Sequence, residues 1–143
     1  MKDDPRALIQ AWLKKADNDL KNAELILAAQ DEDLPFDTVC FHCQQAAEKY
    51  LKAFLVNCDT SFPFSHNLAD LVELCKQSDI TFSSIQRKAE ELTPYAVALR
   101  YPDDFYLPSK EEAREALAIA KEVREFILTR IDSNAKGNAE DKG

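Results

Sequence analysis

The sequence predicts an all-α protein, an antiparallel up-and-down four-helix bundle with an additional short helix. Apolar residues recur at intervals of three and four along most of the 143 residues, as on the buried faces of helices. Both glycines, Gly137 and Gly143, lie near the C-terminus, so the first 136 residues have none for tight β-turns or phosphate-binding loops. Long helices joined by short connections favour an antiparallel bundle.

The first helix is expected to begin with Asp4 as its N-cap and Pro5 in its first helical position, and to run to about Gln30. Residues 31–35 connect it to a second helix that runs from about Phe36 to Cys58. The apolar stripe of the second helix consists of Cys40, Cys43, Ala47, Tyr50, Leu51, Phe54 and Cys58. A separate polar stripe of the same helix consists of His42, Gln45, Lys49 and Lys52.

A short third helix is expected next, with Ser65 or His66 near its cap. Its apolar residues are Leu68, Leu71, Val72 and Cys75. Residues 83–86 fit a capping box at the start of a fourth helix, because a serine is followed three residues later by a glutamine. Pro94 breaks or restarts this helix, and residues 95–99 fit one further helical turn.

A second capping box, Ser109–Glu112, opens the last helix, whose apolar stripe ends at Ile131. Residues 100–106 before it are expected to form an ordered loop, because nearby prolines prevent helix continuation. We therefore expect one bundle domain over residues 1–133 and a disordered polar tail over residues 134–143.

The formal net charge is −8, so the field of the whole domain does not attract nucleic acid. Any contact with a nucleotide or RNA requires a local basic patch. The chain contains no apolar run long enough to span a membrane, and its N-terminus lacks the apolar stretch of a secretion signal. We expect a cytoplasmic protein without membrane contact.

The segment Cys40-Phe-His-Cys43 looks like a metal-binding knuckle, but the helical prediction argues against it. On a helix that turns by about 100° per residue, His42 lies roughly 200° around from Cys40. The remaining cysteines, Cys58 and Cys75, do not form the second ligand pair of a structural zinc site. We predict four reduced thiols, most of them buried, with no metal and no cofactor.

Three blocks of sequence, in order along the chain, resemble the HEPN domain family. They are Phe41-His-Cys-Gln-Gln-Ala-Ala-Glu-Lys49, Ser65-His-Asn-Leu68 and Leu99-Arg-Tyr-Pro-Asp103. The resemblance implies a helical bundle that pairs as a homodimer. It also implies a small prokaryotic protein often encoded beside a minimal nucleotidyltransferase, in pairs that include toxin–antitoxin modules.

Many HEPN proteins are metal-independent ribonucleases whose site is an arginine followed four to six residues later by a histidine. This chain lacks that motif, because its histidines are His42 and His66 and none follows Arg100. We therefore expect a binding module for a nucleotidyltransferase-type partner. The alternative is an endoribonuclease toxin with a non-standard site built from His42, His66 and Arg100.

The polar stripe of the second helix has two interpretations. It forms either a hydrated surface or dimer seam, or a small nucleotide or anion pocket. In the pocket, Lys49 and Lys52 supply charge, and His42 and Gln45 orient the ligand. Arg100 then binds phosphate from outside the helix, or else forms a structural ion pair. Tyr101 either stacks on a base or plugs the end of the core.

Overall fold

The computed structural model describes residues 4–65, 67–98 and 107–142, and for residues 97–98 and 132–142 it describes the backbone alone. Throughout the described ranges, every regular element is a helix. The elements are α1 (Pro5–Ala28), α2 (Phe36–Asn57), α3 (Leu68–Ser78), the 3₁₀ helix η1 (Ile80–Ser84), α4 (Gln86–Glu90), α5 (Tyr95–Ala98) and α6 (Lys110–Lys142). The predicted all-α fold class is confirmed.

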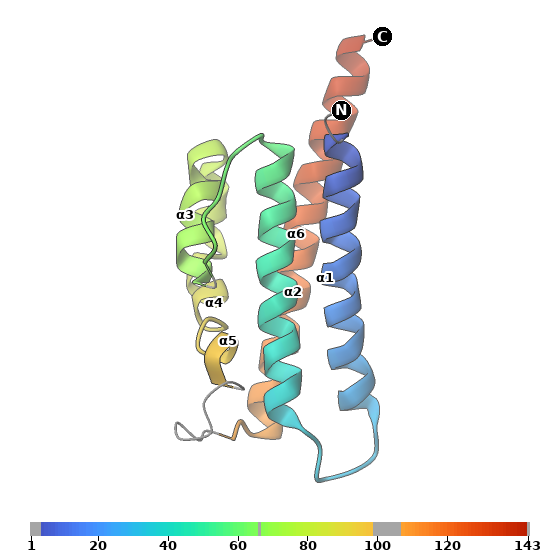
Figure 1. Cartoon of the computed structure of the whole chain (residues 1–143), viewed down its shortest axis with the longest axis vertical. Coiled ribbons are helices and arrows are strands. Elements are labelled where there is room, and N and C mark those ends of the chain that lie inside the picture. The colour runs from blue at the N-terminus through green and yellow to red at the C-terminus, as the bar shows by residue number, and fades with distance from the viewer. Residues whose placement is uncertain (1–3, 66, 99–106, 143) are drawn as a thin grey trace.

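The bundle consists of α1, α2, α6 and one rod made of short helices, and α3 is the additional short helix (Figure 1). Helix α1 runs antiparallel to α2, and α6 lies behind them both. The rod of short helices is called the third rod because it lies between α2 and α6 in chain order, and it consists of η1, α4 and α5. The connection that follows α2 returns along the bundle, so that α3 starts near α5 (Figure 1). There the Leu68 amide donates to Oγ1 of Thr93, two residues before α5, at 3.2 Å.

Helix α1 starts as its sequence predicts. Asp4 is the N-cap, its Oδ1 accepts from the Arg6 amide at 3.0 Å, and Pro5 occupies the first turn. Such a cap satisfies a backbone N–H that has no helical partner.

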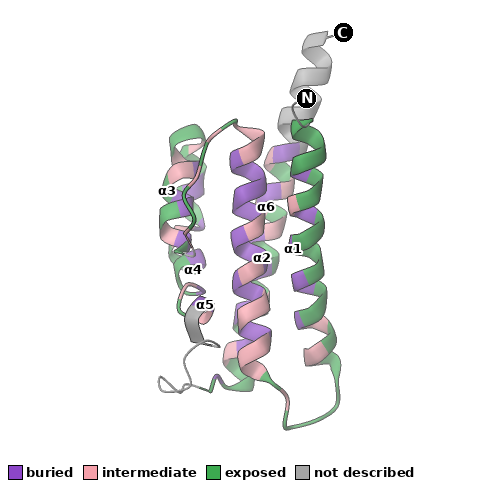
Figure 2. Cartoon of the chain, in the orientation of Figure 1, coloured by how far each residue is buried: buried purple, intermediate pink, exposed green. Residues whose placement is uncertain are grey.

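Helix α2 is the central element of the bundle, and none of its residues is fully exposed (Figure 2). Its apolar stripe packs against α1 on one side and α6 on the other. Beside it, Phe82 of η1 lies between Phe54 of α2 and Phe126 of α6, with ring centroids 4.5 and 4.8 Å apart. Burial of these aromatic side chains fixes the broken third rod against the two long helices.

The predicted capping box at residues 83–86 is wrong. Asp79 takes that role one turn earlier, since its side chain accepts from the Thr81 amide at 3.0 Å and starts η1. Helix α4 begins only at Gln86 and has no side-chain cap. Gln86 instead contacts Glu73 and Lys76 of α3. The cap at Asp79 and the burial of Phe82 therefore start the helical segment at η1, before the predicted cap at Ser83.

Arg130 of α6 contacts Asp79 and Thr81 at the start of η1. Its Nε lies 3.2 Å from Asp79 Oδ2, and its Nη2 donates to Thr81 Oγ1 at 2.9 Å. The guanidinium carbon lies 3.2 Å from the centroid of the Phe126 ring. These contacts join η1 to α6 on the surface of the core.

Helix α6 begins with the predicted capping box. The Glu112 amide donates to Ser109 Oγ at 3.1 Å, and the Ser109 amide donates to Glu112 Oε1 at 3.3 Å. Its buried stripe continues as far as Ile131. The helix includes residues 134–142, for which the sequence predicts a disordered tail, and the boundary at residue 133 stays a prediction. None of the helices described combines the length and apolarity needed to cross a membrane.

Candidate functional site

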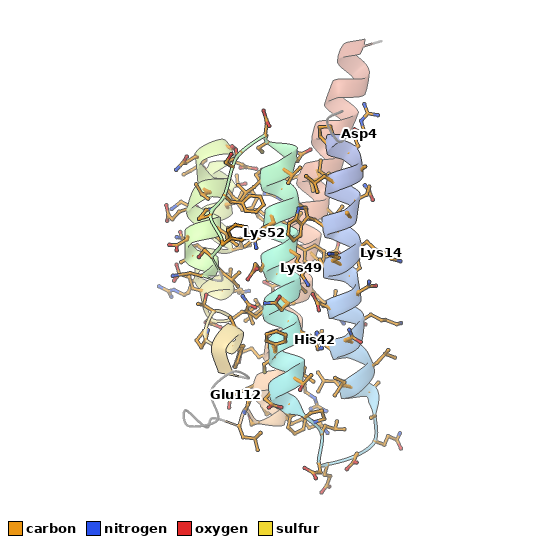
Figure 3. The ribbon with its side chains drawn as sticks, viewed as in Figure 1. Asp4, Lys14, His42, Lys49, Lys52 and Glu112 are labelled. Atoms are coloured by element: carbon orange, nitrogen blue, oxygen red, sulfur yellow. The ribbon has the colours of Figure 1, made fainter. Side chains whose placement is uncertain are left out.

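The polar stripe of α2, on which Figure 3 labels His42, Lys49 and Lys52, contacts α1 through Asp19. Asp19 Oδ1 lies 2.9 Å from His42 Nδ1, and Oδ2 accepts a hydrogen bond from Lys49 Nζ. The Asp19 side chain is 12% exposed, whereas those of His42 and Lys49 are 23% and 22% exposed. One carboxylate of α1 thus contacts two side chains on the same side of α2, one through each of its oxygens.

The other lysine of the stripe belongs to a buried polar chain along α2. Lys52 Nζ donates to Glu48 Oε2 at 2.8 Å, and these side chains are only 10% and 4% exposed. Gln44 Nε2 donates to Glu48 Oε1 at 3.1 Å, and Gln45 Nε2 donates to Gln44 Oε1 at 2.6 Å. Because the pair is desolvated, its hydrogen bonds matter more than those of an exposed pair.

Two aromatic rings cover Lys52. Its ammonium lies 5.5 Å from the ring centroid of Trp12 in α1 and 5.7 Å from that of Phe62 in the connection after α2. The two rings contact each other edge to face, with centroids 6.3 Å apart. This cation–π arrangement ties the connection over residues 58–67 to α1 across α2.

A second polar cluster lies between α1, α2 and α6. Tyr50 donates its hydroxyl hydrogen to Asp17 Oδ1, and Arg124 Nε donates to the same oxygen at 3.1 Å. Burial and the Asp17 carboxylate raise the pKa of Tyr50 above its ordinary value. The sequence pattern placed Tyr50 in the apolar stripe, and its ring is indeed buried. The pattern did not predict the hydrogen bond from its hydroxyl to Asp17.

The structure brings together four of the predicted ligand-binding residues. His42, Gln45, Lys49 and Lys52 lie along one side of α2, and both lysines are paired with carboxylates. The predicted residues Arg100 and Tyr101, and the candidate catalytic residue His66, lie outside the described residues.

Sequence reasoning missed Asp19 and Glu48 as partners of this stripe. The spacing of Glu48 and Lys52, four residues apart on a helix, is a readable signal for an ion pair. Asp19 gives no such signal, because it comes from another helix.

The four cysteines are free thiols, and three of them are fully buried. Burial raises the pKa of Cys40 and of Cys43 to about 12, which keeps both thiols protonated at neutral pH. Nowhere in the described part of the chain do three His, Cys, Asp or Glu side chains group as metal ligands.

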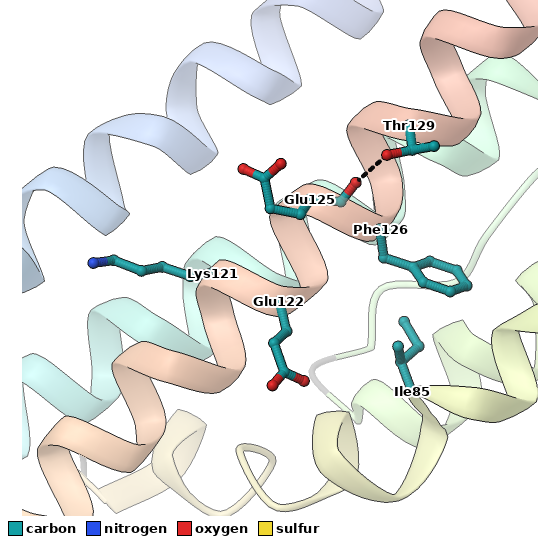
Figure 4. A pocket seen from close by; sticks show the side chains of 6 residues that line it. All are labelled: Ile85, Lys121, Glu122, Glu125, Phe126 and Thr129. Atoms are coloured by element: carbon teal, nitrogen blue, oxygen red, sulfur yellow. Dashed lines mark hydrogen bonds between the residues drawn. The ribbon is translucent and has the colours of Figure 1, made fainter.

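A groove of about 500 Å³ lies apart from this stripe, between α6 and Ile85, the N-cap residue of α4 (Figure 4). It is lined by Ile85, Lys121, Glu122, Glu125, Phe126 and Thr129. Lys88 closes over Glu122 at 3.0 Å, and Thr129 Oγ1 donates to the Glu125 carbonyl at 2.9 Å. Among the predicted ligand-binding residues that the structure describes, none lines this groove.

The bundle, with its central helix and partnered polar stripe, defines a small helical module. The family model of the HEPN domain matches residues 9–131, and the chain belongs to this family. Among solved structures, an archaeal HEPN homologue is 22% identical, with a TM-score of 0.68 over 86% of this chain and 97% of that one. A protein from Thermus thermophilus is 26% identical, with a TM-score of 0.67 over 85% of this chain and 96% of that one. No curated protein matches the sequence.

Proposed function

We propose that the chain is a homodimeric HEPN module that binds a nucleotidyltransferase-type protein, as one half of a two-component system of the toxin–antitoxin kind. A nucleotide or another phosphate ligand binds at the polar stripe of α2. The observation that carries the homodimer is an apolar surface around Trp12.

The Trp12 surface is defined as the contacting rings of Trp12 and Phe62 together with their exposed apolar neighbours in sequence, Leu8 and Phe64. Leu8 precedes Trp12 by one turn of α1 and is 44% exposed. Phe64, two residues after Phe62, is fully exposed at 106%. The contact between the Trp12 and Phe62 rings joins the two segments. Apolar side chains that gather on a surface supply the anchors of protein interfaces, because their burial on association removes them from water.

Light scattering of the full chain tests the homodimer. We expect a dimeric mass for the wild type and a monomeric mass for the double variant Leu8→Ser with Phe64→Ser. Leu25→Ser is the matched control, since Leu25 is 59% exposed at the other end of α1 and should leave the dimer intact. A wild type that is monomeric at micromolar concentration would contradict the proposal.

Co-expression with the product of the neighbouring gene tests the partner. If that gene encodes a nucleotidyltransferase, the two proteins should purify as one complex of defined mass. Separate elution of two folded proteins would count against this pairing.

The ligand is tested by thermal unfolding in the presence of nucleoside triphosphates. A ligand that binds only the folded state raises the apparent stability, so the melting temperature should rise with ligand concentration. Lys49→Gln should abolish the rise, whereas Lys14→Gln on the exposed side of α1 should keep it. Equal responses of both variants would remove the polar stripe from the proposal.

A second candidate function, metal-independent RNA cleavage, is favoured by the hydrogen bond between Asp19 and His42. A carboxylate on Nδ1 orients an imidazole and fixes the tautomer that exchanges protons through Nε2. The purified chain would then cleave single-stranded RNA in the presence of a chelator. His42→Ala and Arg100→Ala should each abolish cleavage, and intact RNA in the wild-type reaction would remove this candidate.

A further inference from the structure

The Asp19 carboxylate has the contacts that an anionic ligand would make at the polar stripe. Each of its oxygens interacts with a different donor, Oδ1 with His42 Nδ1 and Oδ2 with Lys49 Nζ. A phosphate group binds protein through the same kind of charge-assisted hydrogen bonds. An anion at His42 and Lys49 therefore has to replace Asp19.

The exposures make such replacement feasible. The two donors are about twice as exposed as the carboxylate between them, at 23% and 22% against 12%. The donors are thus accessible from solvent, while the bound anion belongs to α1. An incoming ligand needs no unfolding of the bundle to reach them, only rotation of one short side chain.

The competition is unequal. Asp19 is part of the chain and has no cost of association, whereas a free anion loses translational and rotational freedom on binding. A small anion with few negative charges gains too little from two donors to replace it. A chain of phosphates carries more negative charge, so its attraction to the same two donors is stronger.

We propose that Asp19 is a built-in competing anion, which blocks the site between His42 and Lys49 to inorganic phosphate and admits only polyphosphate groups. The inference rests on the phosphate ligand of the proposed function and adds the ligand class and the device that selects it. It is independent of the dimer and of the protein partner.

Calorimetric titration of the full chain with inorganic phosphate and with tripolyphosphate tests this inference. Asp19→Asn removes the competing charge and keeps an oxygen near the donors. Because hydrogen bonds to charged groups contribute more than neutral ones, we expect it to bind tripolyphosphate roughly tenfold or more tightly than the wild type. Inorganic phosphate should bind measurably to the variant only.

Asp17→Asn is the matched control. It removes the same charge two residues earlier, from the cluster with Tyr50 and Arg124. Its tripolyphosphate affinity should equal that of the wild type. An equal gain in both variants would show a general effect of net charge and would overturn the proposal.

Two further measurements keep the test decisive. Lys49→Gln in the Asp19→Asn background should abolish the gain, and Asp19→Ala should reproduce it if the asparagine variant unfolds. No gain in any folded Asp19 variant would overturn the inference. Light scattering on the same samples shows separately whether the dimer of the proposed function exists, and the RNA-cleavage candidate predicts the opposite, a loss of activity on Asp19→Asn.

Discussion

The buried pair of Lys52 and Glu48 should show strong energetic coupling in a double-mutant cycle. Lys52→Met removes the ammonium and keeps an apolar side chain of similar length against the Trp12 and Phe62 rings. Glu48→Gln removes the carboxylate charge and keeps an amide at nearly the same position. Each single variant removes one side of the buried ion pair between Lys52 and Glu48.

The expected magnitude follows from burial. The two side chains are 10% and 4% exposed, so solvent compensates little for a lost partner. Removing one member of a buried ion pair costs about 3–5 kcal/mol. We expect about 3 kcal/mol for Lys52→Met, because Glu48 keeps its hydrogen bond from Gln44. The double variant should lie within about 1 kcal/mol of the wild type, since a neutral amide and a thioether suit this position among aromatic rings.

Urea unfolding of the four proteins measures the cycle. The two single variants should lose free energy of unfolding at an unchanged denaturant dependence, and the double variant should recover most of it. The reasoning would be refuted by single effects that add, with a coupling free energy below about 0.5 kcal/mol, because the pair would then behave like an exposed one. A steeper or shallower denaturant dependence in one variant would reveal a change in the unfolded state instead.

Further predictions concern acid stability, thiol reactivity and capping. The hydrogen bonds from Thr81, and also Arg130, lower the pKa of Asp79, so the stabilisation from Asp79 is present above the ordinary aspartate pKa and is lost as pH falls through the lowered value. Asp79→Asn should therefore make the free energy of unfolding less dependent on pH in that range. An unchanged acid transition would contradict this. Cys58, the one partly exposed thiol, should react first with a thiol reagent at pH 8. Cys75 should react only in denaturant, because burial raises its pKa. Mass spectrometry of the labelled peptides checks the order, and simultaneous labelling would be inconsistent with it. Ser109→Ala should lower the free energy of unfolding by about 1 kcal/mol in urea, since it opens the capping box of α6, and a loss below about 0.3 kcal/mol would mean that the cap is not formed in solution.

The sequence predicted well those features that depend on neighbouring residues. The cap of α1 and the capping box of α6 form as expected, because Asp4 and Ser109 act within three residues of their own positions. The same reasoning failed at the third rod. There, Asp79 competes as a cap with the serines, and the burial of Phe82 between two long helices decides between them. Local patterns do not weigh such contacts.

The candidate site divides in the same way. Helical spacing placed His42, Gln45, Lys49 and Lys52 along one side of a helix, and α2 carries all four residues in helical register. The partner of His42 and Lys49 depends on how the helices pack, because it comes from α1. Asp19 lies thirty residues before its hydrogen-bond partner Lys49 in the sequence. No residue pattern within α2 indicates that Asp19 is this partner.

The order of amino acids was enough to predict an all-α bundle, a second helix with an apolar and a polar stripe, and membership of the HEPN family. These follow from periodicity, turn chemistry and motif residues, all of which act over a few positions along the chain. Only the packing of helices in three dimensions decided the carboxylate partner of Lys49 and the burial of the pair formed by Lys52 and Glu48. Packing of α1 on α2 brings Asp19 to Lys49, and burial strengthens the pair of Lys52 and Glu48 by excluding water.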